Sequence, residues 1–386
     1  MLKFRIGLIA IALCWGGPAN QQKAAYPPAA AGSGMPLFAT SPEGKLHLSW
    51  IDPLPEGGHA LRLSRWNGVE WESPETIAQG NHWFVNWADF PAVSFLPNGA
   101  AYAHWLARPA NGGKYGYGIR LARRGPDGKW QQSAAINEYD HQDYAGFLSF
   151  SGNQIAFLAP ADPADGHRKT LRVASLDADG KIKQMQMLDA DVCSCCQTSI
   201  MRTNTGMLVA YRDHLPGEIR DISLVRYSGG QWSEAYPLHR DGWQINACPT
   251  EGPSLAVAGN TIGAAWITRA GGVSKLNFAT SRDDGKSFSQ PVQVDDGNPL
   301  GRAHLIALDE QSFALVWIER VAQAAEIRVR RITAQQRKSP SLPIQPVPAS
   351  RAAGLPKIAL HRNELFIAWR EEAVKAVRLP ASSLPQ

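Results

Sequence analysis

The sequence predicts an all-β fold, a β-propeller built from four-stranded antiparallel blades. The main observation is a repeat, because seven similar segments each end in a large apolar or aromatic residue, at intervals of 51 to 55 residues. The last residues of these segments are Trp50, Trp105, Leu158, Tyr211, Trp266, Trp317 and Trp369. Within each repeat, alternating apolar residues and turn signals every ~8–12 residues indicate short strands. Four such strands in about 50 residues are typical of a propeller blade.

The seven repeats predict seven blades in one domain, residues 36–386. Each blade begins with a strand such as 91–96 and continues with the segment that ends in the large residue. A third strand such as 274–281 follows, and a polar turn leads to the fourth. The last repeat has a third strand, 373–380, but no fourth. We therefore expect the N-terminal segment to complete this blade, or the blade to keep three strands; a six-bladed ring with one displaced hairpin is the alternative.

The N-terminus has the pattern of an export signal. Lys3 and Arg5 precede an apolar run over 6–15, and small residues follow at 17–19. A charged start, a short apolar region and a small-residue cleavage site are typical of a signal peptide, here over residues 1–19. The apolar run is shorter than the ~20 residues that span a bilayer. We therefore expect no transmembrane segment in the mature chain.

The export signal predicts a periplasmic or secreted protein. The alternative is a lipoprotein anchored through Cys14, although Leu13 stands where a lipobox has Gly, Ala or Ser. Residues 20–35 are rich in Ala, Pro and Gly, and we expect them to be flexible or loosely docked. Export implies an oxidising compartment, in which cysteines commonly form disulfides.

Charge and composition exclude several classes of function. The chain has 39 basic and 34 acidic residues, a formal net charge of +5, and its basic residues are scattered among acidic ones. No basic stripe therefore indicates nucleic acid binding. With 44% hydrophobic and 19% charged residues, the chain is neither a disordered tail nor a membrane bundle. It contains no phosphate-binding loop, dinucleotide fingerprint or HExxH motif.

One turn of the fifth repeat carries a specific motif, since residues 281–288 fit the Asp box S-x-D-x-G-x-[ST]-[WF]. Its defining residues are Ser281, Asp283, Gly285 and Phe288. We expect the Asp to accept hydrogen bonds from turn amides, the Gly to adopt positive φ and the Phe to pack between sheets. Through this motif and weaker copies in other repeats, residues 36–386 resemble the sialidase superfamily of β-propellers, which carry bacterial neuraminidase repeats. The resemblance implies that the Asp box itself is structural.

Propeller connectivity predicts which loops share a face of the ring. The links between blades and those between second and third strands lie on one face, opposite the turns of the Asp-box type. Most histidines and cysteines, and dense Arg, Asp and Trp clusters, fall on this link face, where a rigid scaffold can position functional loops. The ligand-binding candidates there are Arg212, Asp213, Arg220, Asp221, Arg302, Trp243 and Trp87. Three guanidinium groups can clamp a carboxylate through forked hydrogen bonds; the alternative is that they form structural ion pairs with neighbouring acidic residues.

The resemblance implies binding, with or without cleavage, of an acidic sugar or a similar anionic ligand. Sialidases hold the substrate carboxylate with three arginines and use a Tyr nucleophile paired with a Glu, and an Asp acid/base. The residues here that would take these roles are Arg212, Arg220 and Arg302 for the carboxylate, Tyr144 or Tyr139 for the nucleophile, and Asp140 or Glu251 for proton transfer. This function requires no cofactor, and whether the protein is an enzyme stays open.

The four cysteines outside the signal predict a second type of site. Cys193, Cys195 and Cys196 form C-x-C-C in one link, and Cys248 lies in the next link. An even number of cysteines in an exported protein favours two disulfides, but a bridge within C-x-C-C closes a small, strained ring. The alternatives are a soft-metal site and a thiol redox site. Copper suits the pattern better than zinc, because the paired C-x-x-C of zinc sites is absent.

Three functions therefore stay open: an acidic-sugar site, a cysteine-based metal or redox module, and a propeller that binds a protein partner without chemistry. Arginines that converge in one pocket would favour the first, and free thiols or a bound metal the second. An apolar, open link face would favour the third.

Overall fold

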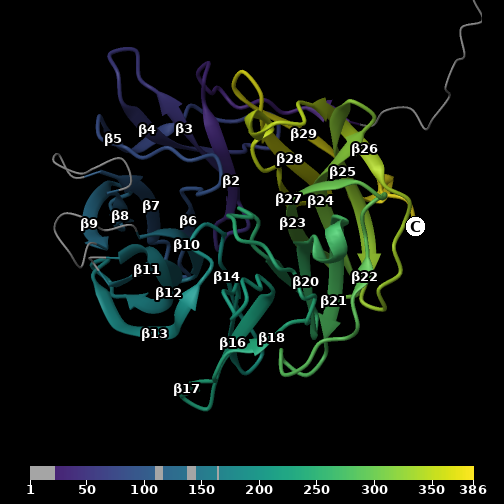
Figure 1. The fold of residues 1–386 in the computed structure, drawn as a ribbon. Coiled ribbons are helices and arrows are strands. Elements are labelled where there is room, and N and C mark those ends of the chain that lie inside the picture. Colours follow the sequence, from purple (N-terminus) through teal and green to yellow (C-terminus); the bar gives the residue numbers. More distant parts are fainter. Residues whose placement is uncertain (1–21, 109–115, 137–144, 163–164) are drawn as a thin grey trace, which may run out of the picture.

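The computed structural model describes residues 22–386, except 109–115, 137–144 and 163–164, and shows a seven-bladed β-propeller (Figure 1). Seven antiparallel sheets surround a central axis, so the prediction of seven blades is confirmed and the six-bladed alternative is wrong. Within each sheet the strands follow one another in sequence order. The exceptions are blade four, where β18 also pairs with β16, and blade seven, which is completed by β1.

The first four blades contain β2 to β18. Blade one comprises β2 (Gly34–Thr40), β3 (Leu46–Pro53), β4 (His59–Arg65) and β5 (Glu75–Gly80). Blade two comprises β6 (Val93–Phe95), β7 (Ala101–Ala107), β8 (Gly118–Arg124) and β9 (Trp130–Ile136). Blade three comprises β10 (Gly146–Ser151), β11 (Gln154–Asp162), β12 (Asp165–Leu176) and β13 (Ile182–Val192). Blade four comprises β14 (Ser199–Arg202), β15 (Gly206–Arg212), β16 (Ile222–Ser228), β17 (Gln231–Trp232) and β18 (Tyr236–Pro237).

The last three blades contain β19 to β29 and β1. Blade five comprises β19 (Ser254–Ala258), β20 (Thr261–Thr268), β21 (Lys275–Ser281) and β22 (Val292–Gln293). Blade six comprises β23 (Pro299–Asp309), β24 (Ser312–Val321), β25 (Ala324–Thr333) and β26 (Leu342–Val347). Blade seven comprises β27 (Lys357–His361), β28 (Glu364–Arg370), β29 (Val374–Pro380) and β1 (Lys23–Ala24). Short 3-10 turns are η1 (Ala270–Gly272), η2 (Arg351–Ala353) and η3 (Ala381–Ser383). Among the described residues, no helix has the length and apolar character needed to cross a membrane.

The first strands of the blades form the wall of a central channel. Each of them contacts the first strand of the next blade, and the circle closes where β27 contacts β2. Figure 1 shows these inner strands around the axis and the fourth strands at the periphery. Because all inner strands run in the same direction, the residues just before them gather at one end of the channel.

The N-terminal segment completes the seventh blade, as predicted. Lys23 and Ala24 pair antiparallel with β29, and the next amide, that of Ala25, donates to Ala376 (2.9 Å). The amide of Val374 in turn donates to the hydroxyl of Ser33 (2.8 Å). The described part of the segment 20–35 is therefore docked on the ring, which agrees with the docked alternative and not with the flexible one.

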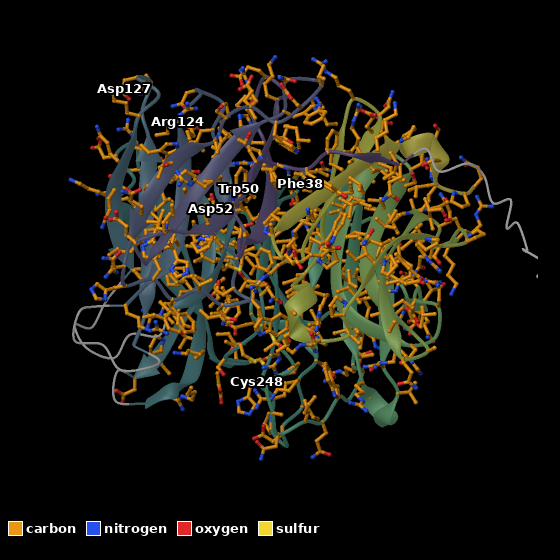
Figure 2. The ribbon with its side chains drawn as sticks, turned by 90° about the horizontal axis from the view of Figure 1, so that it is seen from above. Phe38, Trp50, Asp52, Arg124, Asp127 and Cys248 are labelled. Carbon is orange, nitrogen blue, oxygen red and sulfur yellow. The ribbon has the colours of Figure 1, made fainter. Side chains whose placement is uncertain are left out.

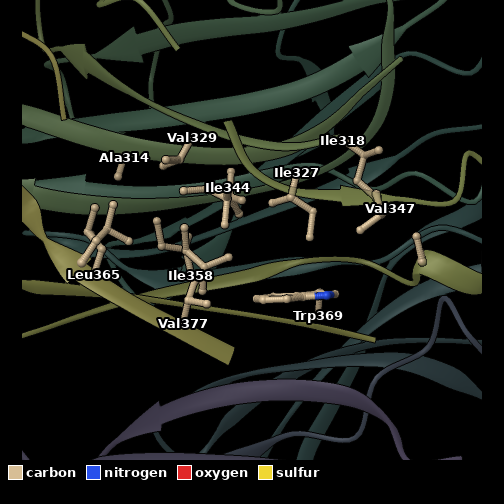
Figure 3. Packing of buried hydrophobic residues seen from close by; sticks show 14 of the residues in the cluster. Ala314, Ile318, Ile327, Val329, Ile344, Val347, Ile358, Leu365, Trp369 and Val377 are labelled. Carbon is tan, nitrogen blue, oxygen red and sulfur yellow. The ribbon is translucent and has the colours of Figure 1, made fainter. Parts of the chain in front are cut away.

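The core consists of apolar side chains packed between neighbouring blades. Figure 3 shows one such interface, where Ile327 and Ile344 of blade six face Ile358, Leu365 and Trp369 of blade seven. All five side chains are buried. Burial of this kind stabilises the ring by roughly 25 cal/mol per Å² of apolar surface removed from water.

The buried tryptophans of the repeat make one recurrent polar contact. In blades one, six and seven the indole N–H donates to an acidic residue two positions later: Trp50 to Asp52 (2.7 Å), Trp317 to Glu319 (2.7 Å) and Trp369 to Glu371 (2.9 Å). Residues two apart on a strand point to the same face, so the carboxylate lies beside the ring. In blade six, this carboxylate also accepts the amide of Asn298 (2.6 Å), the residue just before β23, and so fixes the segment that enters the blade.

The turn over residues 281–288 has the geometry predicted for it. Asp283 accepts the amide of Ser287 (3.0 Å) and the hydroxyl of Ser281 (2.7 Å). Gly285 has φ of +82°, and Phe288 packs against the apolar cluster between blades four and five. The hydrogen bonds that Asp283 accepts lower the pKa of this carboxyl to about 2, although burial opposes the shift.

The structure also separates the two kinds of loop as predicted. Figure 2 shows Cys248, which lies in the link between blades four and five, at the opposite end of the molecule from Asp127. Asp127 lies in the turn between β8 and β9, the position of the Asp-box turn in blade two. The link face is therefore one end of the ring, and the hairpin turns form the other.

Removing the docked N-terminal segment should destabilise the ring. A chain that begins at Ser33 loses the pairing of β1 with β29 and leaves the indole N–H of Trp71 without its acceptor, the carbonyl of Ala25. We expect the free energy of unfolding to fall by about 2–4 kcal/mol, at ~1 kcal/mol for each lost hydrogen bond. Urea denaturation followed by tryptophan fluorescence measures this. A chain that begins at Gln22 is the control; equal stability of the two would refute the closing role of β1.

The hydrogen bond from the indole to the carboxylate should add stability beyond that gained from packing of the tryptophan ring. Trp317→Phe leaves the buried Glu319 without its indole donor, and we expect about 1–3 kcal/mol lower stability in urea denaturation. Trp130→Phe is the matched control, because the indole N–H of Trp130 is buried without a hydrogen-bond partner among the described residues. We expect less than half the loss there. Equal losses would show that ring volume, not the hydrogen bond, matters.

Candidate functional site at the central channel

The central channel contains a cavity of about 280 Å³ at the core of the ring. Its wall comes from the inner strands and the residues just before them. Apolar side chains such as Phe150, Ile200 and Leu255 lie within the strands, whereas Asp89, Gln197 and Glu251 precede them. The cavity therefore combines apolar strand residues with polar groups, and its acidic residues stand at the link-face end of the strands.

Asp89 and Glu251 occupy equivalent positions in two parts of the ring. Asp89 leads into blade two and accepts the amide of Phe147 in blade three (2.8 Å). Glu251 leads into blade five and accepts the amide of Arg302 in blade six (2.7 Å). Both amides lie in β-bulges and at positive φ, +53° at Phe147 and +60° at Arg302.

A glycine makes room for each carboxylate. A Cβ atom on Gly146 would lie 2.4 Å from an oxygen of Asp89, and one on Gly301 would lie 2.9 Å from an oxygen of Glu251. Because real Cβ contacts are not this short, a larger residue at either position would displace the acid. The bulge of one blade is thus shaped to hold the acidic residue of the preceding one.

Gln197 connects the two acidic segments. Its side-chain amide donates to the carbonyl of Ala88, and its side-chain oxygen accepts the amide of Gly252 (2.8 Å). Ala88 is the neighbour of Asp89 in the chain, and Gly252 is the neighbour of Glu251. Gln197 therefore ties together the two backbone segments that carry the acids, at the link-face end of the channel.

Both acids are difficult to ionise in the channel wall. Burial raises the pKa of Asp89 to about 7, and the single amide that it accepts offsets only part of this effect. Burial also raises the pKa of Glu251 to about 7, against the influence of the Arg302 amide and nearby cations. One oxygen of Asp89, Oδ1, is buried without a hydrogen-bond partner among the described residues. Perturbed carboxyl groups in an enclosed cavity are typical of functional sites.

Two basic residues line the same cavity. Lys357 forms no salt bridge within the described residues and lies 4.8 Å from the centre of the Phe90 ring. Burial lowers the pKa of Lys357 to about 8, although Glu251 favours its charged form. Burial lowers the pKa of His304 to about 3, and its Nδ1 accepts the amide of Ile358 (3.2 Å), so the neutral ring carries its proton on Nε2. Among the described residues, the cavity thus holds one ammonium group that makes no salt bridge and has Glu251 as its acidic neighbour.

The predicted arginine clamp does not form, because two of its members are committed to backbone carbonyls. All three guanidinium nitrogens of the buried Arg212 donate to carbonyls, including those of Glu251 (2.8 Å) and Ile267 (2.9 Å). Arg302 donates to the carbonyl of Ser350 (2.8 Å) and lies over the Trp87 ring (5.2 Å). These arginines tie the links of neighbouring blades together.

The other ligand-binding candidates also have internal partners. Arg220 pairs with Glu218 (2.5 Å), a neighbouring acidic residue, as the ion-pair alternative expected. Asp221 accepts the amides of Gly242 and Trp243, and Asp213 accepts the hydroxyl of Ser223 (2.6 Å). Trp243 is buried, with the guanidinium of Arg212 4.7 Å from its ring centre. This group stabilises the links and does not line the channel cavity.

Three of the predicted catalytic residues, Tyr139, Asp140 and Tyr144, lie outside the described residues, as do the signal over 1–19 and Cys14. Glu251 is the one predicted proton-transfer residue that the structure places, and it lines the channel. Asp89 and Lys357 were not among the predicted site residues. A signal for the acids exists: each stands two residues before a proline that precedes an inner strand, in Asp89-Phe90-Pro91 and Glu251-Gly252-Pro253.

The four cysteines are free thiols, so the expectation of two disulfides is wrong. Cys193, Cys195 and Cys196 are buried together in the link between blades three and four, with sulfur–sulfur distances of 3.4 to 4.0 Å. Cys248 is exposed, and its thiol lies close enough to interact with that of Cys195. Within the described residues, the buried trio is the group of side chains close enough together to hold a metal ion.

No family model and no curated protein matches this sequence. Among solved structures, an ulvan lyase of a polysaccharide lyase family aligns with TM-score 0.57 and 11% identity, over 92% of this chain and 95% of that one. An α-L-arabinofuranosidase of Fusarium graminearum aligns with TM-score 0.52 and 12% identity, over 94% and 99%. A Dyadobacter fermentans protein of unknown function aligns with TM-score 0.53 and 15% identity, over 93% and 98%.

These proteins share the β-propeller fold of this chain. The resemblance predicted from the repeat is therefore confirmed at the level of the fold. At 11 to 15% identity, these similarities extend no further than the arrangement of the blades.

The raised pKa of Glu251 should be visible in the pH dependence of stability. Between its usual value of 4.5 and about 7, the folded state binds more protons at Glu251 than the unfolded state does. Stability therefore decreases as the pH rises through this range, by about 1–3 kcal/mol. Glu251→Gln removes this decrease. The free energy of unfolding of the variant, measured by urea denaturation, should therefore rise relative to that of the wild type between pH 4.5 and 8.

Glu218→Gln is the control for this measurement. The hydrogen bond from Arg220 holds the pKa of Glu218 below its usual value, so this carboxylate favours the folded state above pH 4.5. Glu218→Gln should therefore lose stability relative to the wild type as the pH rises, the opposite of the change expected for Glu251→Gln. A wild-type profile parallel to that of Glu251→Gln would show that Glu251 ionises normally.

Proposed function

We propose that the protein binds an acidic sugar unit of a glycan at the link-face end of its central channel. The observation that carries the proposal is the ammonium of Lys357, which has no salt bridge with the described residues and lines the same cavity as Asp89 and Glu251. An ammonium group that forms no salt bridge and lies in a cavity of mixed polar and apolar lining favours an anionic ligand, since a ligand carboxylate can accept its hydrogen bonds. At about 280 Å³, the cavity is near the lower end of ligand pockets and suits a single sugar ring.

The two carboxyl groups suit the hydroxyl groups of such a ring. Asp89 Oδ1 has no hydrogen-bond partner among the described residues, and a sugar hydroxyl can donate to it. A carboxyl group with a pKa of about 7 is partly protonated at neutral pH, so Glu251 can give a proton to a glycosidic oxygen or accept one from water. Paired acidic residues around the scissile bond are the usual machinery of glycoside hydrolysis.

The solved structures are consistent with this proposal. The arabinofuranosidase is described in complex with arabinobiose, and the ulvan lyase with a unit that contains GlcA, an acidic sugar. In the proposed site, Lys357 takes the place that the sequence had assigned to Arg212, Arg220 and Arg302. Tyr139 and Tyr144 play no part in the proposal, because they lie outside the described residues.

The binding proposal is tested by titration calorimetry with oligosaccharides ending in glucuronic or sialic acid, and with neutral oligosaccharides. We expect binding of an acidic ligand that Lys357→Met weakens about 10- to 100-fold, the effect of losing a charged hydrogen bond. Lys375→Met is the matched control, because Lys375 also lies over an aromatic ring, that of Tyr26 (4.6 Å), but on the outermost strand pair of blade seven. Preference for neutral sugars, or equal losses in both variants, would overturn the proposal.

Cleavage is tested separately from binding. Glu251→Gln should keep affinity within a few-fold, since the amide oxygen still accepts the Arg302 amide, but lower the turnover of a cleaved glycan by about 10²–10⁴-fold. Release of reducing ends measures turnover. Turnover unchanged in Glu251→Gln would remove this residue from the chemistry, and binding without any turnover would make the protein a glycan-binding propeller.

A further inference from the structure

The buried thiols form a compact triangle between blades three and four. The sulfur atoms of Cys193 and Cys196 are 3.4 Å apart, those of Cys193 and Cys195 3.7 Å, and those of Cys195 and Cys196 4.0 Å. These distances are well beyond the ~2.05 Å of a disulfide bond. The point equidistant from the three sulfurs lies about 2.2 Å from each of them, close to the ~2.3 Å of a zinc–thiolate bond. The triangle therefore has the size of a metal site.

The surroundings of the triangle are apolar. The three cysteines belong to a buried cluster with Val192, Ile200 and Met207, and their exposed fractions are 1, 7 and 2%. Within the described residues, no histidine or acidic side chain lies close enough to the three sulfurs to share a metal ion with them. The available ligand set is therefore sulfur alone, which selects soft cations.

A positive charge lies beside this sulfur cluster. Arg212 donates only to backbone carbonyls and forms no salt bridge within the described residues, so its charge is not neutralised by an acid. It interacts electrostatically with Cys193 and Cys196, and its carbonyl accepts the amide of Cys193 (3.1 Å). Three thiolates and a monovalent cation carry a net charge of −2, which the guanidinium group partly offsets.

We propose that the thiolates of Cys193, Cys195 and Cys196 bind one Cu(I) ion, with Cys248 as an exposed thiol at the rim of the site. An ion in the plane of the triangle reaches all three sulfurs at metal–thiolate distance, as three-coordinate Cu(I) requires. Zn(II) prefers four ligands in a tetrahedron, so it would need Cys248 as its fourth. Binding replaces the three thiol protons with the metal and involves no change of oxidation state, since copper enters as Cu(I).

The test uses the full mature chain, purified and titrated without oxygen. Cu(I) is supplied as its bathocuproine disulfonate complex, and loss of the colour of that complex reports transfer to the protein. We expect one Cu(I) per chain. Cys196→Ser should weaken Cu(I) binding more than about 100-fold, beyond the ~10–100-fold effect of residues that only support a ligand. Cys248→Ser should keep the stoichiometry and accelerate the exchange of copper with the chelator.

Two controls separate the site from the fold. Met207→Leu removes another sulfur of the same cluster, and we expect it to bind Cu(I) as the wild type does. Circular dichroism melting without metal shows whether Cys196→Ser is folded. If that variant unfolds, Cys195→Ser takes its place.

Three results would overturn the proposal. Binding of neither Cu(I) nor Zn(II) by the reduced protein would remove the metal site, as would binding unchanged in both cysteine variants. Tighter binding of Zn(II) than of Cu(I), lost in Cys248→Ser, would replace the three-coordinate assignment with a four-thiolate zinc site. The glycan titrations do not depend on these results, because the thiols lie in the link and not in the channel cavity.

Discussion

Closure of the ring is the constraint on which the rest of the molecule depends. Seven sheets can enclose a channel only if the last one meets the first, and here the contact of β27 with β2 completes the inner circle. The chain secures this closure by returning its N-terminal segment to β29, so that blade seven is built from both ends of the sequence. Radial closure also removes long exposed sheet edges.

Closure places loops that are far apart in sequence at one end of the channel. Asp89 and Glu251 are separated by three blades, yet both make the same contact with a bulged amide of the next blade. Gln197 joins their segments through two hydrogen bonds. The polar end of the channel is therefore a product of the ring's approximate symmetry. Lys357, which forms no salt bridge with the described residues, departs from that symmetry.

Arg212 shows how a residue's role follows from its surroundings. Its position in the sequence predicts that it is one of three arginines that bind the carboxylate of a ligand. In the structure its nitrogens hold the carbonyls of three different segments, and its charge remains uncompensated beside the cysteine cluster. A structural arginine can thus provide the positive potential that a group of thiolates requires. The same link region thereby combines mechanical and electrostatic functions.

The sequence by itself determined the architecture. Local strand periodicity, the repeat of about 50 residues and the Asp-box turn specify blades, their number and the face on which the links gather, because these signals arise from neighbouring residues. The partners of individual side chains depend on contacts between blades. Only the tertiary structure decided that Arg212 and Arg302 bind carbonyls, that the cysteines stay unbridged, and that Lys357 enters the cavity of Asp89 and Glu251. Burial and distances across the ring set hydrogen-bond partners and pKa values. They depend on residues far apart in the sequence, so no local pattern predicts them.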